Sequence, residues 1–362
     1  MLFCYPIDAA SENWLHECLV EMVTSAIDQI ESGNSPVGWP ACIPADHRSK
    51  LRTRTGIRGR FRAFCETAEK LSSAERSVIL DAISSENNFP GIFTGVGECL
   101  TNKDLPASMR EVTKDLFEFA FELLTQFEIR DRQYRLIYDA TEAHVCPFCG
   151  IEAFDAPGVA REDLDHYLAI SLYPFAGVNL RNLTPMGKKC NAAHKRATDM
   201  LRHQDSRARR RCIDPYVGPT ASVSLLDSMP FEGEQRGAIL LPSWRIDLNG
   251  PNEEVSTWDE VFSIRRRYKE NVLDAEFRGW MDNFAQWCQL EFGVLQDAAD
   301  VINALGRYLA AVIQEGFADR VFLKKAVFEM LRQRCVDPLV SERLVAWFIA
   351  LVSPTEGATA SA

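Results

Sequence analysis

The sequence predicts an α+β protein in which a small mixed segment separates two mainly helical regions. Apolar residues recur at helical spacing before residue 135 and again after Trp258, as expected for helices that bury one face. The residues between them include closely spaced cysteines, histidines and many basic side chains. We therefore expect a helical domain over 1–135, a small functional module over 136–220, a mainly helical domain over 221–353 and a disordered polar tail over 354–362.

Composition and cysteine usage narrow the class of protein. The chain has 362 residues, of which 46% are hydrophobic and 25% are charged, as in ordinary globular proteins. Its longest purely apolar run, Leu344 to Val352, is too short to span a bilayer. The N-terminus lacks the pattern of a secretory signal. Eleven scattered cysteines, an odd number, fit a reducing cytoplasm better than a disulfide framework. We expect a cytoplasmic protein that does not enter the membrane.

Charge is unevenly distributed along the chain. The formal net charge is −11, yet seven basic and no acidic residues lie between Arg48 and Arg62, and ten basic against two acidic residues lie between Arg181 and Cys212. Either run alone is typical of a solvated face, and the first, with interleaved Thr and Gly, also of a mobile arm. Two such runs on an acidic protein favour a phosphate-rich ligand.

The clearest helix of the N-terminal region is expected to begin at Ser108. Ser108 and Glu111 have the spacing of a capping box, in which a hydroxyl and a carboxylate satisfy the first free amides of a helix. Apolar residues follow at helical spacing and predict one buried stripe: Val112, Leu116, Phe119, Leu123 and Phe127.

A metal site is indicated by Cys146-Pro-Phe-Cys149-Gly. A CxxC turn followed by glycine is typical of a zinc knuckle, because the turn directs two thiolates at one tetrahedral ion. A redox motif has the same spacing but normally lies in a thioredoxin-like βαβ unit, of which the sequence shows no sign.

Further motifs follow in a fixed order: Asp163-Leu-Asp165-His166, then Asn182-Leu183, then Cys190-Asn191 with His194 and Lys195. Together with the CxxC turn, this order resembles the HNH endonucleases, also called ββα-metal or His-Me finger nucleases. The longer string from Asp165 to Lys195 is similar to the HNH subunits of bacterial anti-phage systems of the Septu and retron-associated kind. The resemblance covers Cys146 to Tyr216.

The resemblance implies a ββα-metal module that hydrolyses phosphodiester bonds. His166 matches the general base that takes a proton from water. Asp165 and Asn191 match the ligands of a catalytic Mg²⁺ or Mn²⁺. Asn182 matches the loop asparagine that braces the hairpin and helps to orient the base.

The resemblance also implies a structural zinc ion held by Cys146, Cys149 and Cys190. Many relatives have a second CxxC, but the position three before Cys190 is Gly187. The fourth ligand is therefore open. His194 follows Cys190 by four residues, on the same face of a regular α-helix. His144, Cys212 or a three-ligand site are the alternatives.

We expect a DNA endonuclease that acts as the effector of a defence system and is restrained by a partner, such as an ATPase subunit, or by its own flanking domains. Lys188, Lys189, Lys195 and Arg196 are the expected nucleic-acid contacts, and Arg202 lies nearby. Two alternatives stay open: a non-catalytic, zinc-containing adaptor that binds nucleic acid, and an HNH nuclease that acts on RNA.

Overall fold

The computed structural model describes residues 1–141, 143–159, 164–237, 239–313 and 316–353. It divides into two compact units: residues 1–220 with 251–262, and residues 221–250 with 263–362. The expected N-terminal helical domain and the expected central module therefore lie within one unit. Asp163 of the Asp-His motif and the expected disordered tail, 354–362, lie outside the described residues.

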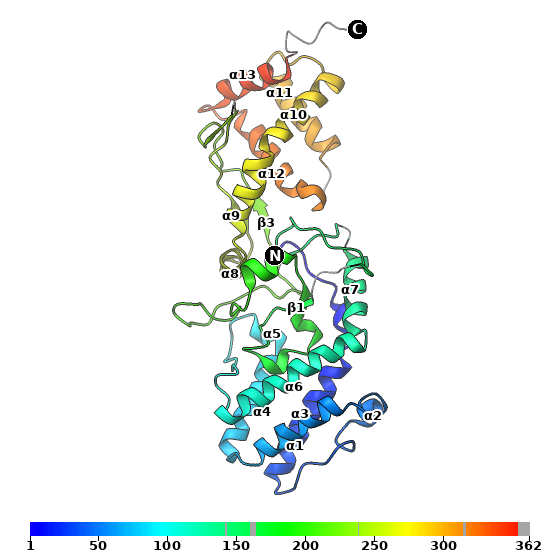
Figure 1. The fold of residues 1–362 in the computed structure, drawn as a ribbon. Coiled ribbons are helices and arrows are strands. Elements are labelled where there is room, and N and C mark those ends of the chain that lie inside the picture. The colour runs from blue at the N-terminus through cyan, green and yellow to red at the C-terminus, as the bar shows by residue number, and fades with distance from the viewer. Residues whose placement is uncertain (142, 160–163, 238, 314–315, 354–362) are drawn as a thin grey trace. The chain divides into compact units, whose positions relative to one another are not determined.

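The first unit is largely helical before residue 141, as predicted. Within it, α1 contacts α3 and α4, and α3 contacts α6 (Figure 1). The elements are η1 (Ile7–Ala10), α1 (Trp14–Glu31), α2 (Ala45–Leu51), α3 (Thr55–Ala68), α4 (Ser73–Asn87), α5 (Phe89–Ile92), α6 (Ala107–Gln126) and α7 (Ile129–Ala140).

Helix α6 begins two residues earlier than its apparent capping box requires. Pro106 precedes the first turn, no side chain caps it, and Ser108 lies inside the helix. The prediction of a capping box at Ser108 was therefore wrong: proline, with its fixed φ, ends the preceding loop there. Of the expected stripe, Leu116 and Leu123 are buried. The other buried positions on α6 are Met109, Thr113, Phe117, Ala120 and Leu124.

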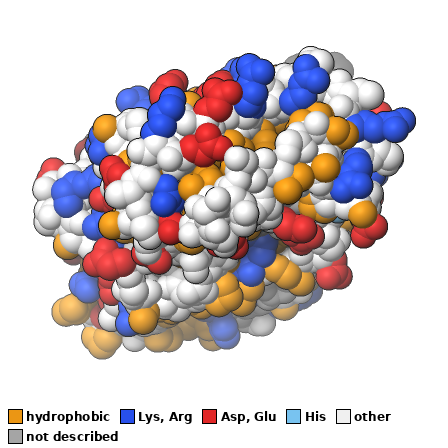
Figure 2. Space-filling model, turned by 90° about the horizontal axis from the view of Figure 1, so that it is seen from below, with side chains coloured by type: hydrophobic (Ala, Val, Ile, Leu, Met, Phe, Trp, Pro, Cys, Tyr) orange, Lys and Arg blue, Asp and Glu red, His pale blue; other side chains and the backbone are white. Residues whose placement is uncertain are grey.

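The basic run from Arg48 to Arg62 forms parts of α2 and α3. The expectation of a mobile loop or arm was wrong, because apolar residues of the same stretch, including Ile57 and Phe61, are buried beneath it. Arg60 pairs with Asp115 at 2.9 Å and lies over a ring of α6. On the face seen in Figure 2, Lys and Arg side chains are interspersed with Asp and Glu.

The central segment contributes a short antiparallel strand pair and a short helix. Strand β1 (Leu164–His166) pairs with β2 (Leu183–Pro185), so that Asp165 lies opposite Thr184 and His166 opposite Leu183. Between the strands lie η2 (Pro174–Ala176) and η3 (Leu180–Asn182), and η4 (Cys190–Lys195) follows β2. The order strand, strand, helix is the one that the resemblance implies.

Helices of the same unit cover this small module. Gln133 of α7 donates to Leu180 O at 2.8 Å, and Phe117 of α6 packs edge-on against Phe175. Helix α8 (Asn252–Phe262) also belongs to this unit, and the indole of Trp258 donates to Phe148 O at 2.8 Å. Because a two-stranded pair has little core of its own, the surrounding helices supply most of the apolar contacts that position the module.

The second unit combines two small strand pairs with a helical core. Strand β3 (Ser222–Ser224) pairs with β6 (Asp247–Asn249), and β4 (Gln235–Arg236) pairs with β5 (Ile239–Leu240). Its helices are α9 (Ile264–Tyr268), η5 (Lys269–Leu273), α10 (Asp274–Glu291), α11 (Ala298–Ala311), η6 (Ala318–Arg320), α12 (Val321–Arg334) and α13 (Ser341–Val352). Among the described residues, no helix is both long and apolar enough to cross a membrane.

Candidate functional site

Three cysteines meet at one buried point of the first unit. The sulfur atoms of Cys146, Cys149 and Cys190 all lie within 4.8 Å of one another. Backbone amides of Cys149 and Gly150 donate to Cys146 O at 3.2 and 2.7 Å, which closes the CxxC turn. Gly150 has a φ of 64°, the left-handed conformation that glycine adopts without strain. The turn thus directs two thiols at the third, which lies at the start of η4.

The surroundings of these sulfurs suit a metal-bound thiolate. Ile151 N donates to Cys149 Sγ at 3.4 Å, and the amide of Gly187 donates to Cys146. Burial raises the pKa of Cys146 well above its ordinary value, so that the thiol is neutral unless a cation is present. Three buried sulfurs with amide donors form a fitting donor set for a soft tetrahedral ion such as zinc.

None of the three expected fourth ligands lies with the cysteines. In the described part of the chain, the group of metal-capable side chains at this point comprises the three cysteines alone. The ring of His144 stacks on Tyr138 at 3.9 Å, and the thiol of Cys212 lies against Tyr167.

Helix η4 is a π-helix, in which the amide of Arg196 bonds to Asn191 O, five residues back, at 2.8 Å. Lys195, the last residue of η4, is buried, whereas His194 is half-buried. In the part of the chain that the structure describes, His194 is not among the side chains that gather with Cys190, so the structure does not bring this expected fourth ligand to the site.

Glu152 lies beside the cysteines, and the sequence motifs did not point to it. Its Oε1 accepts a hydrogen bond from Lys189 N at 2.8 Å, and its Oε2 accepts one from Cys190 N at 3.1 Å. Oε2 also lies 3.9 Å from Cys149 Sγ. The carboxylate thus joins the CxxC turn to the first residue of η4.

The imidazole of His166 is buried and held by a backbone carbonyl. Its Nε2 lies 2.8 Å from Gly177 O, and its ring centroid lies 4.4 Å from that of Phe121 on α6. Because a carbonyl oxygen only accepts, Nε2 carries the proton and Nδ1 is the basic nitrogen. The side chain is only 7% exposed, and burial lowers the pKa of His166 to about 4. The ring is therefore neutral at physiological pH.

Asn182 connects both ends of the loop that carries Gly177. Its Oδ1 accepts from Leu168 N at 2.7 Å, while its Nδ2 donates to Leu168 O at 2.9 Å and to Ala176 O at 3.2 Å. These are the contacts expected of an asparagine that braces the hairpin. On the other side of the loop, buried Glu86 accepts from Ala176 N at 3.2 Å, and burial raises its pKa well above the ordinary value.

Asp165 pairs with the last residue of η4. Lys195 Nζ lies 3.5 Å from Asp165 Oδ2 and donates to Arg196 O at 3.2 Å. Lys195 is only 1% exposed, so the expectation that it contacts phosphates from the surface was wrong. Its side chain instead ties η4 to β1, and Asn191 lies half-buried in the first turn of the same helix. The remaining expected contacts, Lys188, Lys189 and Arg196, are exposed.

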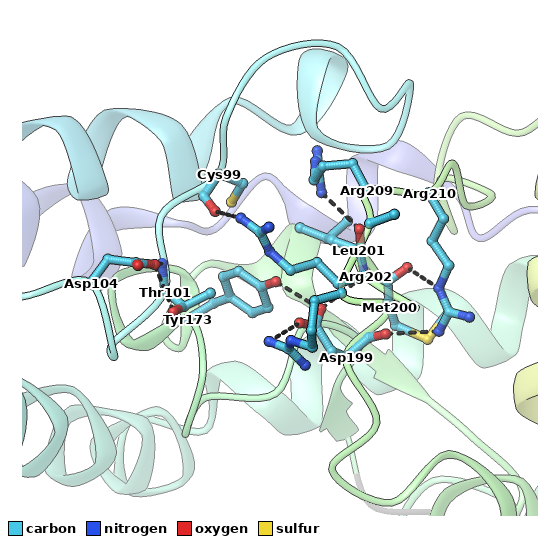
Figure 3. Close-up of polar contacts among 12 residues, drawn as sticks. Cys99, Thr101, Asp104, Tyr173, Asp199, Met200, Leu201, Arg202, Arg209 and Arg210 are labelled. Carbon is cyan, nitrogen blue, oxygen red and sulfur yellow. Dashed lines mark hydrogen bonds and ion pairs between the residues drawn. The ribbon is translucent and has the colours of Figure 1, made fainter. Parts of the chain in front are cut away.

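The arginines after η4 mostly hold a loop in place (Figure 3). Arg210 is fully buried, donates to Asp199 O at 2.8 Å and pairs with Glu260 at 2.7 Å. Arg202 donates to Cys99 O at 3.3 Å, and Tyr173 donates to Asp199 Oδ1 at 2.7 Å. Arginines of the second basic run therefore form hydrogen bonds and ion pairs with groups of the same unit.

No protein family, curated protein or solved structure matches the chain.

Proposed function

We propose that the chain is a metal-dependent endonuclease of the HNH class that cleaves DNA as the effector of a bacterial anti-phage system. The observation that carries the proposal is the arrangement around β1. The neutral imidazole of His166 is oriented by Gly177 O. The preceding residue, Asp165, carries a carboxylate that pairs with Lys195 of η4. The motif order that resembles HNH nucleases supports it.

The residues have separate tasks in this proposal. His166 would accept a proton from water through Nδ1, since Nε2 is engaged with Gly177 O. Asn182 and the loop it braces keep that carbonyl in place. Asp165 and Asn191 would hold a divalent cation, Mg²⁺ or Mn²⁺, which when bound supplies charge stabilisation at the scissile phosphate.

The donor types fit such a cation. The side chain of Asp165 is 28% exposed, so it offers hard oxygen atoms to an ion that keeps some of its water. The amide oxygen of Asn191 is a donor of the same kind. The exposed Lys188, Lys189 and Arg196 would contact the backbone of the nucleic acid.

One observation favours a second function, a zinc-containing adaptor that binds nucleic acid without cleaving it. Phe121 covers the ring of His166, and the ammonium of Lys195 already neutralises part of the charge on Asp165. For the nuclease, the same contacts imply that α6 must shift before substrate reaches the base. A partner such as an ATPase subunit would provide that control.

Cleavage assays separate the two functions. The purified chain, alone and with proteins encoded beside it, is incubated with Mg²⁺ and plasmid, linear DNA, single-stranded DNA or RNA. We expect DNA cleavage that His166→Ala abolishes and that His203→Ala, a change outside the strand pair, preserves. Cleavage of RNA alone would reassign the substrate. Equal cleavage by wild type and His166→Ala would contradict the proposed base.

A further inference from the structure

We propose that Glu152 is the fourth ligand of the metal centre, which makes it a site of three thiolates and one carboxylate. The inference rests on the zinc centre proposed above but not on nuclease activity. It assigns the open coordination position to a residue on the turn that follows the CxxC motif.

The carboxylate of Glu152 lies near one of the three sulfurs, that of Cys149. In a tetrahedral zinc site, a sulfur and an oxygen ligand are about 3.5 Å apart, given the usual zinc–sulfur and zinc–oxygen bond lengths. Glu152 Oε2 is 3.9 Å from Cys149 Sγ. A movement of a few tenths of an ångström brings this pair to ligand spacing. The carboxylate does not lie within 4.8 Å of all three sulfurs, because the group that meets this spacing consists of the cysteines. Coordination therefore also requires the carboxylate and the remaining sulfurs to approach one another by about an ångström.

Gly187 leaves the space that the carboxylate occupies. A Cβ atom at Gly187 would lie 2.6 Å from Glu152 Oε2 and 2.7 Å from its Cβ, far inside contact distance. The amide of the same glycine donates to Cys146. Glycine at this position therefore allows the carboxylate to lie beside the sulfurs, and a larger residue would displace it.

Two backbone amides hold the carboxylate in this orientation. Lys189 N donates to one oxygen at 2.8 Å and Cys190 N to the other at 3.1 Å. A carboxylate oxygen accepts more than one partner, so Oε2 can bind a cation and keep its amide. The amides are thus the outer contacts that orient a metal ligand.

The test measures metal binding by the full-length chain. Purified wild type is expected to hold one zinc ion, with an X-ray absorption spectrum that fits three sulfurs and one light atom. Glu152→Ala should bind zinc roughly 10–100-fold more weakly in competition with a chelator. Glu152→Gln keeps the size of the side chain and one oxygen that can accept a hydrogen bond from a backbone amide. It serves as the second variant if the alanine variant does not fold.

A replacement by cysteine separates a ligand from a residue that merely supports one. With Co²⁺ in place of zinc, Glu152→Cys should raise the thiolate-to-metal absorption by about one third, as three thiolates become four. His194→Ala and Cys212→Ala should leave zinc affinity and the cobalt spectrum unchanged.

Three results would overturn the inference: a wild-type chain that binds no zinc, wild-type zinc affinity in Glu152→Ala, or a Glu152→Cys spectrum without the added thiolate band. Failure here is distinguishable from failure of the nuclease proposal. If DNA cleavage depends on His166 but zinc affinity does not depend on Glu152, the nuclease proposal holds and the assignment of Glu152 as a ligand is wrong.

Discussion

The ammonium of Lys195 lies 3.5 Å from a carboxylate oxygen of Asp165, and this pair joins the end of η4 to strand β1. The lysine is buried while the aspartate is partly exposed, so the pair lies at the edge of the module with its positive member inside. Burial lowers the pKa of Lys195, and the charge of Asp165 opposes that shift. The pair therefore combines a structural contact with the electrostatics of the candidate base and metal ligands.

Replacing this lysine should affect stability more than DNA affinity. In Lys195→Met, Asp165 loses its partner, and we expect a loss of about 1–2 kcal/mol in the free energy of unfolding, less than for a fully buried pair because Asp165 is partly exposed. Exposed Lys188→Met provides the matched control: it should keep stability and weaken DNA binding. Urea denaturation and a DNA-binding assay measure the two effects. The reverse pattern would show that Lys195 contacts phosphate.

Phe121 is expected to restrain the candidate base. The centroid of its ring lies 4.4 Å from that of His166 and 4.4 Å from the guanidinium carbon of Arg130. Phe121→Ala opens the space above the imidazole, and we expect partner-independent DNA cleavage to increase severalfold, with a modest loss of stability. Phe119→Ala, on the same helix but against Arg60, is the control and should leave cleavage unchanged. A Phe121→Ala chain that is no more active than wild type would argue against this restraint.

The free energy of unfolding should decrease as the pH falls, because α1 contains a buried histidine, His16. Burial lowers the pKa of His16 to about 4, whereas an unfolded histidine has its ordinary value near 6.5. The unfolded chain therefore takes up the proton first, so the contribution of His16 is complete above pH 6.5 and is lost as the pH falls toward 4. Between pH 7 and pH 5 it amounts to roughly 2 kcal/mol.

The measurement compares urea unfolding of wild type and His16→Gln at both pH values. The variant should lose about 2 kcal/mol less stability on acidification than wild type does, whatever its stability at pH 7. Equal losses in the two proteins would mean that His16 does not remain neutral in the folded state.

Part of the site could be predicted from the sequence. The CxxC turn indicated a metal site by its spacing, and the resemblance implied that Cys190 joins it; the three sulfurs do lie together. The order of two strands and a helix was likewise what the resemblance implied. Spacing alone reaches only the tight CxxC turn, because Cys190 and the strands come from more distant parts of the chain.

The contacts that the sequence did not reveal come from distant segments or from unusual backbone geometry. Phe121 reaches His166 from α6, and Glu86 reaches Ala176 from α4. The π-helical hydrogen bonds of η4 and the burial of Lys195 at its end were not predicted either. Glu152 follows a recognisable motif, but its role depends on the space that Gly187 leaves, which a single sequence does not express.

The strongest structural prediction concerns Asn182, which is fully buried and whose side chain makes three hydrogen bonds to the loop that carries Gly177. Asn182→Ala leaves Leu168 N without its acceptor and Leu168 O without this donor, whereas Ala176 O keeps the bond from Asn179 N, and each buried unpaired group costs about 1–3 kcal/mol. We expect a loss of roughly 3 kcal/mol in unfolding free energy, and lower cleavage because Gly177 O no longer fixes His166. Asn34→Ala, an exposed loop change, should alter neither quantity. Unfolding curves and cleavage rates at one pH decide the matter: wild-type values for Asn182→Ala would mean that the loop holds the imidazole without this side chain.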